Sequence, residues 1–252
     1  IQERKSWLCV GLDMSPESLG SDKFDDLKNH TFKVIDSTKD YAVAYKPNFA
    51  FFERWGAKGF SWLEETVEYI GNDHIKIADA KRGDIGNTAR QYAYSIFEHF
   101  GFDCVTINPY MGSDSVVPFL DNKEKGVFLL TKTSNASAVT LQDIRENGIS
   151  IYERVVQMAK DLNYNNNVGL VVGATAPKDL KTIRSISLGM PILIPGVGAQ
   201  GGDLNTCMRI GNNDGISLIN ISRSISFAGD MSPKSIKNAS SNFLAQMHEA
   251  VK

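Results

Sequence analysis

The chain has 252 residues, of which 42% are hydrophobic and 22% charged, and its formal net charge is −2. These values suit one globular α/β domain and give no support for binding to nucleic acid or to a membrane surface. No apolar run approaches the roughly 20 residues of a membrane-spanning helix, and no secretory signal is visible at the start. The three cysteines are far apart and the four histidines are not at metal-ligand spacing, so we expect buried thiols, a reducing compartment and no zinc site.

Short apolar runs alternate with longer stretches of helical spacing along the whole chain. The apolar runs predict eight strands, at residues 7–12, 41–45, 74–80, 104–107, 126–130, 168–172, 191–194 and 217–221. The helical patterns lie at residues 30–39, 58–70, 87–100, 149–162, 177–186 and 233–251. Near-continuous apolar strands are typical of parallel strands buried on both faces, so we predict one (β/α)8 TIM barrel domain over residues 1–252. A doubly wound open sheet is the alternative, but no GxGxxG follows the first strand to support it.

The segment Ile77–Thr88, which reads IADAKRGDIGNT, concentrates charge at the end of the third predicted strand. Asp79 and Lys81 are two residues apart, so they share one face of that strand, and Asp84 falls in the following turn. Three charges at the end of a buried strand are costly unless they pair with one another. Taken alone, the triplet is equally compatible with a structural salt bridge that caps the strand.

Polar residues also stand at the ends of the other predicted strands. In a barrel of this type the active site lies at the C-terminal ends of the strands. In chain order, those ends carry Asp13, Lys46, Asp79 with Lys81, Asn108, Ser134, Gly173, Pro195, and Ser222 with Arg223. The first three strands therefore deliver alternating carboxylate and ammonium groups, which favours an active site over a purely structural network.

A glycine-rich loop follows the seventh predicted strand, in residues 195–203 (PGVGAQGGD). Such a loop exposes backbone N–H groups to an anion, and barrels often bind phosphate between the loops after strands 7 and 8. Arg223, after the eighth strand, would add a bidentate charge-assisted contact, and Gln200 a neutral one. A flexible loop beside a surface arginine is the alternative. We favour a phosphate site, although no nucleophile with an adjacent base, metal cage or cofactor motif accompanies it.

Together these residues resemble the orotidine 5′-monophosphate decarboxylase family. The family signature D-x-K-x-x-D-I-x-x-T is complete in Asp79, Lys81, Asp84, Ile85 and Thr88. Its companion motifs follow in order as Gly11-Leu12-Asp13, Lys46-Pro47-Asn48, Thr133-Ser134-Asn135, the loop 195–203 and Arg223. The resemblance extends from Leu8 to about Ile225. One departure is Ser222, where the family usually has glycine, and it adds a side chain close to the expected phosphate site.

The resemblance implies decarboxylation of orotidine 5′-monophosphate to UMP in de novo pyrimidine biosynthesis, without metal or organic cofactor. By the resemblance, the catalytic residues are Lys46, Asp79, Lys81 and Asp84. The substrate-binding residues are Asp13, Asn48, Ile85, Thr88, Ser134, Pro195, Gln200, Ser222 and Arg223. Lys81 would stabilise the carbanion that forms at C6 of the pyrimidine and would then protonate it.

The resemblance also assigns parts of the substrate to these residues. Asp13 and Lys46 would contact the ribose, and Ser134 the pyrimidine. Gln200 and Arg223 would hold the phosphate as the loop after the seventh strand closes.

The family further implies a cytoplasmic homodimer with shared active sites. Asp84, Ile85 and Thr88 would reach into the site of the partner subunit. Because the sequence begins with Ile1 rather than Met, we expect a trimmed chain or a piece of a longer one, for which a fusion to another pyrimidine-pathway enzyme is conceivable.

Two other functions fit part of the pattern. One is a Mg²⁺-dependent decarboxylase or aldolase of a related barrel that acts on a sugar phosphate. Lys46-Pro47-Asn48 and the Ala199-Gln200-Gly201-Gly202 loop speak against it. The other is a non-catalytic nucleotide-binding barrel, which an intact array of lysines and aspartates disfavours because a pure binder gains nothing from like charge beside its ligand.

Overall fold

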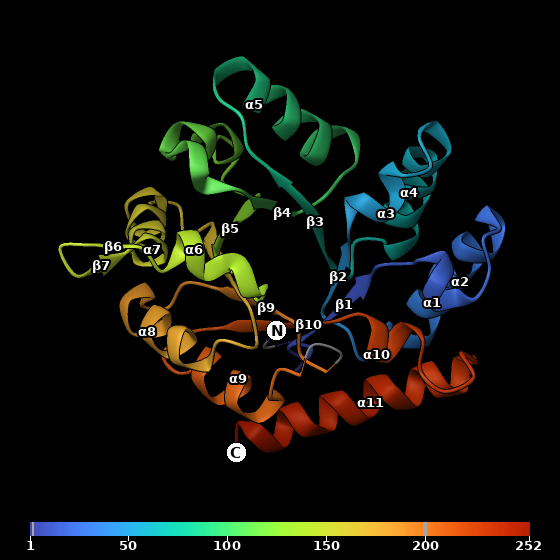
Figure 1. The fold of residues 1–252 in the computed structure, drawn as a ribbon. Coiled ribbons are helices and arrows are strands. Elements are labelled where there is room, and N and C mark those ends of the chain that lie inside the picture. Colours follow the sequence, from blue (N-terminus) through green and yellow to red (C-terminus); the bar gives the residue numbers. More distant parts are fainter. Residues whose placement is uncertain (2, 199–200) are drawn as a thin grey trace.

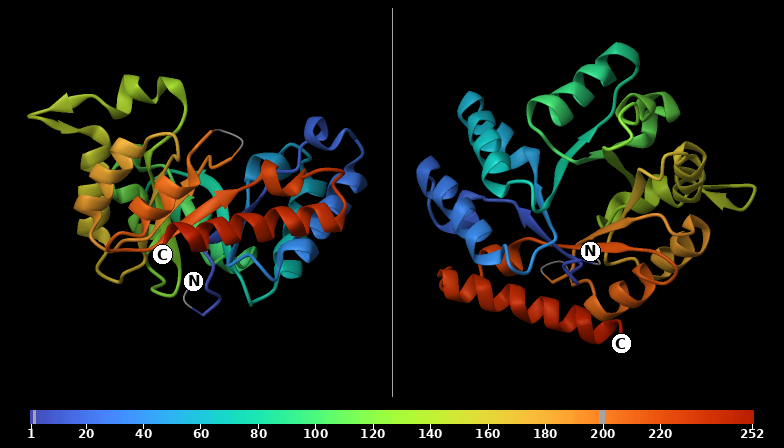
Figure 2. Two further views of the ribbon diagram at one scale, coloured as in Figure 1. Left: turned by 90° about the horizontal axis from the view of Figure 1, so that it is seen from below. Right: turned by 180° about the vertical axis from the view of Figure 1, so that it is seen from behind.

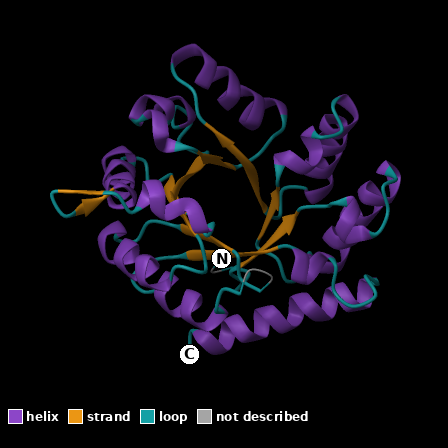
Figure 3. Ribbon diagram, viewed as in Figure 1, coloured by secondary structure: helices purple, strands orange, loops and turns teal. Residues whose placement is uncertain are grey.

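The structure, a computed structural model, describes residues 1, 3–198 and 201–252 and contains a closed ring of eight strands (Figure 1, Figure 3). These strands are β1 (Leu8–Leu12), β2 (Ala44–Pro47), β3 (Ile75–Arg82), β4 (Cys104–Ile107), β5 (Gly126–Lys132), β8 (Val168–Val172), β9 (Ile192–Pro195) and β10 (Ser217–Ile221). Neighbouring strands are parallel, in the order β1-β10-β9-β8-β5-β4-β3-β2. The predicted (β/α)8 TIM barrel is confirmed, and the open sheet is wrong because β1 pairs with both β10 and β2, which closes the ring.

Helices surround the ring and connect its strands (Figure 1). They are α1 (Pro16–Leu19), α2 (Phe24–Thr38), α3 (Phe49–Glu53), α4 (Ala57–Ile70), α5 (Gly86–Tyr94), α6 (Val139–Gln142), α7 (Ile151–Leu162), α8 (Pro177–Ser187), α9 (Leu204–Gly211), α10 (Arg223–Ser226) and α11 (Pro233–Ala250). A π-helical turn, Ser95–His99, extends α5, and short 3-10 turns lie at Pro109–Met111, Ser113–Ser115, Val117–Phe119 and Ala136–Ala138. None of the helices in the described ranges combines the length and apolar character needed to cross a membrane.

A small hairpin interrupts the connection between β5 and α7. Its strands, β6 (Arg145–Glu146) and β7 (Ile149–Ser150), pair in antiparallel fashion. The hairpin projects from the ring, and in the side view it lies toward the end of the barrel opposite the N-terminus (Figure 2, left). The connection after β5 is therefore longer and more elaborate than a simple loop to the next helix.

The apolar pattern places most elements correctly but shifts some of their ends. The strand predicted at 41–45 is β2 at Ala44–Pro47, because the charged Lys46 belongs to the strand although it breaks the apolar run. The helix predicted at 30–39 is α2, which begins six residues earlier, at Phe24. The short helices α3 and α9 are not predicted, since α3 has only 5 residues and α9 only 8.

Two apolar clusters flank the strands. The larger one lies between strands and helices and includes Leu8 and Val10 of β1. The smaller one fills the barrel interior and is formed by Cys9, Val43, Ala44, Ile77, Phe128, Val171, Leu193 and Leu218. Because side chains alternate along a strand, these inward residues fix which later positions also face the barrel axis.

Candidate active site

The inward positions change from apolar to largely polar toward the C-terminal ends of the strands. Two residues beyond the inner apolar layer, or beyond Cys104 in β4, stand Lys46, Asp79, Thr106, Leu130, Gly173, Pro195 and Asn220. These residues line two cavities of about 180 and 280 Å³. Lys46, Asp79 and Pro195 line both cavities, so the two are compartments of one site at the mouth of the barrel.

Three side chains of alternating charge, Lys46, Asp79 and Lys81, lie where the two compartments meet. Lys46 Nζ is 2.6 Å from Asp79 Oδ2, and Lys81 Nζ is 2.5 Å from Asp79 Oδ1. Thr106 Oγ1 donates a further hydrogen bond of 3.2 Å to Asp79 Oδ1. The prediction that Asp79 and Lys81 lie side by side is confirmed. The single carboxylate is thus held between two ammonium groups, one buried and one at the open side of the site.

This arrangement fixes the charge state of the two buried groups. Burial alone would raise the pKa of the Asp79 carboxyl group, but Lys46 and Lys81 outweigh burial and hold that pKa below its usual range. Burial would likewise lower the pKa of Lys46, but the carboxylates of Asp79 and Asp13 outweigh it and raise that pKa. Both groups therefore stay charged at neutral pH.

The backbone of β3 is distorted where it presents Lys81. The pairing of β3 with β4 shifts register between Ala78 and Arg82, as in a β-bulge. Lys81 adopts a φ of 45°, a left-handed conformation that costs a non-glycine residue about 1–3 kcal/mol. Its backbone N–H donates to Thr106 Oγ1 at 3.0 Å, so the residue that supports Asp79 also holds the strained turn. Bulges of this kind re-aim a side chain, and here the result is the contact between Lys81 and Asp79.

The first compartment gathers the residues predicted for the ribose and the phosphate. It is lined by Asp13, Lys46, Asn48, Asp79, Pro195, Gly196, Val197, Asn220, Ser222 and Arg223. Asp13 Oδ1 is buried and has no hydrogen-bond partner among the described residues, so it can accept a hydrogen bond from a ligand hydroxyl group. Arg223 is exposed at the first turn of α10. Gln200, the other residue predicted for the phosphate, lies outside the described residues.

The unusual Ser222 is accommodated by its neighbour Gly11. A Cβ atom on Gly11 would lie 1.9 Å from Ser222 Oγ, so the serine side chain occupies the space that glycine leaves beside β1. Asn220 Nδ2 lies 3.5 Å from the same hydroxyl group. The Ser222 side chain thus packs against strand β1 as well as lining the cavity.

The second compartment contains the residue predicted for the pyrimidine. Ser134 follows β5 and lines this compartment together with Lys81, Thr106 and Lys132. Ser134 is exposed on the cavity side of a segment that connects β5 to α6. The structure therefore brings the predicted pyrimidine contact to the same compartment as the predicted proton donor.

Three residues of the signature lie away from both compartments. Asp84 is in the turn after β3, and its Oδ1 accepts a hydrogen bond of 2.8 Å from the backbone N–H of Ile85. Ile85 is 51% exposed, and Thr88 is exposed on α5. Within the described part of this chain, Asp84 forms no ion pair with Lys81. None of these three residues lines either compartment of the site in its own chain.

Sequence reasoning missed two residues of the site, Thr106 and Asn220. Both lie in strands that read as apolar runs, so neither stands out by composition. Counting two positions from the inward-facing Cys104 and Leu218 would have found them, because residues two apart share a face. Within the described ranges, no three His, Cys, Asp or Glu side chains lie together as a metal site would require.

Comparison with known proteins adds a family to this geometry. Residues 6–235 match the family described as orotidine 5′-phosphate decarboxylase / HUMPS. The chain is 47% identical over 237 residues to an orotidine 5′-phosphate decarboxylase of Haloarcula marismortui, a match that covers 91% of this chain and 85% of that protein.

Solved structures agree with the sequence match. The structure of Leishmania donovani OMP decarboxylase is similar, with a TM-score of 0.89, 36% identity, and coverage of 99% of this chain and 96% of that one. L. donovani UMP synthase is similar too, with a TM-score of 0.91, 38% identity, and coverage of 99% of this chain and 55% of that one. Since the family match covers most of its length, the chain belongs to the orotidine 5′-phosphate decarboxylase / HUMPS family.

Proposed function

We propose that the two-compartment cavity is the site at which this chain decarboxylates orotidine 5′-monophosphate to UMP, a step of pyrimidine biosynthesis, without metal or organic cofactor. Relatives at 47% and 45% identity carry the name of this activity. The observation that carries the proposal is the Lys46–Asp79–Lys81 chain of ion pairs at the barrel mouth. It offers a fixed positive charge beside a fixed negative one, which suits a reaction that moves charge from a carboxylate to a carbon atom.

The two compartments suit the two ends of a nucleotide. The phosphate would lie in the first compartment, against Arg223 and the backbone around Pro195, with Ser222 as a further contact. Gln200, which lies outside the described residues, is a further contact by the family resemblance alone. The ribose would lie in the first compartment near Lys46, which lines both compartments, with Asp13 and Asn48 beside it. The pyrimidine would then reach the second compartment, between Ser134 and Lys81. This orientation places the reacting C6 carbon at the ion pairs rather than at the phosphate.

The chemistry follows from where charge develops. When the bond between C6 and the carboxylate breaks, CO₂ leaves and the electron pair remains on C6. The ammonium group of Lys81 stabilises that growing negative charge and then transfers a proton to C6, which gives UMP. Asp79 would lie against the substrate carboxylate. The repulsion between these two carboxylate groups would be relieved when CO₂ departs. Lys46 keeps Asp79 ionised, and the hydrogen bond from Thr106 helps to hold it in place.

We propose further that the site is completed by a second copy of the chain. Asp84, Ile85 and Thr88 are exposed or half-exposed, and Asp84 makes its described hydrogen bond only to its own turn. An apolar side chain that is 51% exposed at the start of α5 fits a surface that a partner covers. In the dimer these three residues would line the partner's second compartment.

The proposed location is the cytoplasm, a reducing compartment. All three cysteines are free thiols in the structure, and Cys9 and Cys207 are buried. Burial raises the pKa of Cys9 to about 12, so this thiol is unreactive toward oxidants at neutral pH. Fractionation of cells that express the chain tests this, and recovery with secreted proteins would contradict it.

The decisive experiment is an absorbance assay of orotidine 5′-monophosphate with the purified protein in the presence of EDTA. We expect loss of the substrate signal at the same rate with and without the chelator. Dependence on added Mg²⁺ would instead favour the sugar-phosphate chemistry of a related barrel. Binding of UMP without any turnover would favour a non-catalytic nucleotide-binding barrel.

A further inference from the structure

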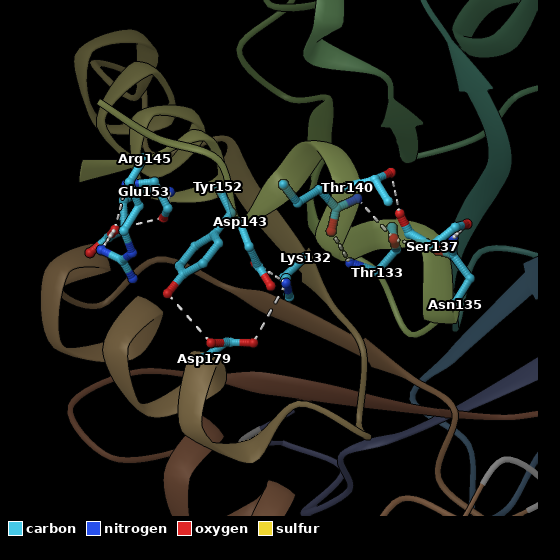
Figure 4. Close-up of polar contacts among 12 residues, drawn as sticks. Lys132, Thr133, Asn135, Ser137, Thr140, Asp143, Arg145, Tyr152, Glu153 and Asp179 are labelled. Atoms are coloured by element: carbon cyan, nitrogen blue, oxygen red, sulfur yellow. Dashed lines mark hydrogen bonds and ion pairs between the residues drawn. The ribbon is translucent and has the colours of Figure 1, made fainter. Parts of the chain in front are cut away.

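A buried lysine ties the segment after β5 to the body of the barrel (Figure 4). Lys132 is the last residue of β5, and its side chain is only 5% exposed. Its ammonium group forms an ion pair with Asp143 and lies 3.7 Å from Asp179 Oδ2. It also lies 5.3 Å from the centre of the Tyr152 ring, and the Tyr152 hydroxyl group donates to Asp179 Oδ1 at 3.4 Å. One cation therefore joins β5 to α7, to α8 and to the residue after α6.

The strand is shaped to make this contact. The pairing of β5 with β8 shifts register between Leu130 and Lys132, as in a β-bulge. A bulge re-aims the side chains that follow it, and here Lys132 reaches the cluster of acidic side chains and Tyr152. A buried ammonium group is costly unless it is paired, so Lys132 and its partners favour one fixed arrangement.

The Lys132–Asp143 ion pair, called the tie below, joins the two ends of a loop that also contains internal hydrogen bonds. The backbone N–H of Thr133 donates to Gln142 Oε1 at 3.0 Å, and Gln142 Nε2 donates to Thr133 Oγ1 at 2.9 Å. Asn135 accepts from Thr133 and donates to Ser137. We name residues 133–143 the cover segment. The two ends of this segment are held together by two contacts. One is the pair of hydrogen bonds between Thr133 and Gln142, and the other is the ion pair between Lys132 and Asp143.

The cover segment also rests closely on Gly173, the residue that follows β8. A Cβ atom on Gly173 would lie 2.9 Å from both the backbone nitrogen and the Cβ of Ser134. The backbone N–H of Gly173 donates to the carbonyl oxygen of Lys132 at 2.8 Å. Ser134 is therefore seated directly on glycine backbone, at the wall of the second compartment. A shift of the segment would therefore move Ser134 relative to Lys81, which lines the same compartment.

We propose that Lys132 is a positioning residue, whose ion pair with Asp143 holds the cover segment at the pyrimidine end of the active site. Lys132 lines the second compartment, but its ammonium group is paired with Asp143 and not with Asp79, so we assign its effect on the base to Ser134. This inference rests on the proposed placement of the pyrimidine in the second compartment. It predicts that breaking the tie weakens recognition of the base and leaves recognition of the sugar phosphate unchanged.

The test compares two ligands that share one end. UMP carries the pyrimidine, whereas ribose 5-phosphate carries only the sugar and the phosphate. Asp143→Ala is the main variant, because it releases the cover segment while Lys132 keeps Asp179 and Tyr152 as partners, so the barrel stays folded. Lys132→Met is the second variant, and Lys181→Met, at an exposed lysine of α8, is the matched control.

We expect Asp143→Ala and Lys132→Met to weaken UMP binding by about 10-fold or more and to lower kcat/KM by up to about 100-fold, since a misplacement of 1 Å can cost that much. The dissociation constant of ribose 5-phosphate should stay within about 2-fold of the wild type, and Lys181→Met should change neither ligand. Equal losses for both ligands, or no loss for either, would overturn the proposal.

A third variant tests whether the tie acts through Ser134. If Ser134→Ala and Asp143→Ala both weaken UMP binding selectively, the tie acts through Ser134 as proposed. If Ser134→Ala has no effect while Asp143→Ala does, the tie does not act through Ser134 and the proposal is overturned. If ribose 5-phosphate fails to compete with UMP in the wild type, the proposed orientation of the nucleotide is wrong, whatever the tie does.

Discussion

Asp79 shows how one residue can organise a site. It accepts from Lys46, Lys81 and Thr106, and the two ammonium groups outweigh the burial that would otherwise raise its pKa. The same contacts leave the ammonium group of Lys81 half-exposed at the open side of the site, with 49% of its side chain accessible. A proton donor must reach the substrate, whereas the groups that orient the donor need not. Accordingly, Lys81 is half-exposed, while the side chains of Lys46 and Asp79 are almost fully buried.

Replacement of Lys81 by alanine should remove nearly all turnover. In the proposed mechanism the substitution takes away both the positive charge beside C6 and the proton that completes the reaction, so we expect kcat to fall by about 1,000-fold or more. Steady-state kinetics of Lys81→Ala measures this, with Lys181→Ala at an exposed site as the control. Substantial turnover by a folded Lys81→Ala protein would show that another group donates the proton.

Replacement of Arg223 by alanine should weaken phosphate recognition without disturbing the fold. Arg223 is exposed, and a bidentate bond from its guanidinium group to phosphate is charge-assisted, so its loss should lower kcat/KM by about 10- to 100-fold. Arg209→Ala, at an exposed arginine of α9, is the matched control. Kinetics of Arg223→Ala that match the wild type would refute the phosphate role.

At the scale of elements, helix α2 supports the helix that carries Arg223. The Nε2 of His30 in α2 lies 2.7 Å from the carbonyl oxygen of Ser226, to which it donates, and the His30 ring stacks on Phe227 at 5.3 Å. Burial lowers the pKa of His30, an effect that nearby Lys33 reinforces and the bond to Ser226 opposes. Helix α10 is thus anchored by a neutral imidazole ring.

This anchor predicts a loss of stability in mild acid. The pKa of His30 is lower in the folded chain than in the unfolded one, so between those two values the unfolded state binds more protons and acid favours unfolding. We expect the stability advantage of the wild type over His30→Gln to shrink as the pH falls from about 7 to about 5, because glutamine does not titrate. Denaturant unfolding at several pH values measures it. An advantage that is independent of pH would mean that His30 does not titrate on unfolding.

The sequence predicts the elements better than it predicts their ends. Apolar runs mark the eight strands, because both faces of a parallel barrel strand are buried. They fail at the strand ends, where Lys46 belongs to β2 and Lys81 to β3 although both are charged. Composition identifies Asp79 as a site residue but not Thr106 or Asn220, whose roles depend on which face of the strand they occupy. Only the closed ring, which aligns neighbouring strands, brings these positions together.

At the scale of the whole molecule, one side of the barrel carries exposed apolar residues on adjoining segments. Ile85 precedes α5, which packs against the turns that follow β4. Those segments present Tyr110, Met111 and Val117, which are 79%, 48% and 39% exposed. Exposed apolar side chains on neighbouring segments are typical of a surface that associates with another protein. Because Asp84 lies on the same side, this surface suits the proposed contact with a second copy of the chain.

The proposed sharing of sites between two copies predicts that two inactive variants restore activity when they are mixed. In a dimer of one Lys81→Ala chain and one Asp84→Ala chain, one site would lack both side chains and the other would keep both, because Lys81 and Asp84 of each site would come from different copies. Random exchange of subunits should therefore restore about a quarter of the wild-type sites. The control is a mixture of Lys81→Ala with Asp79→Ala, where both side chains belong to the same chain's site and every site stays defective. Recovery confined to the first mixture identifies a shared site, whereas absence of recovery after proven exchange places Asp84 in the site of its own chain or outside the reaction.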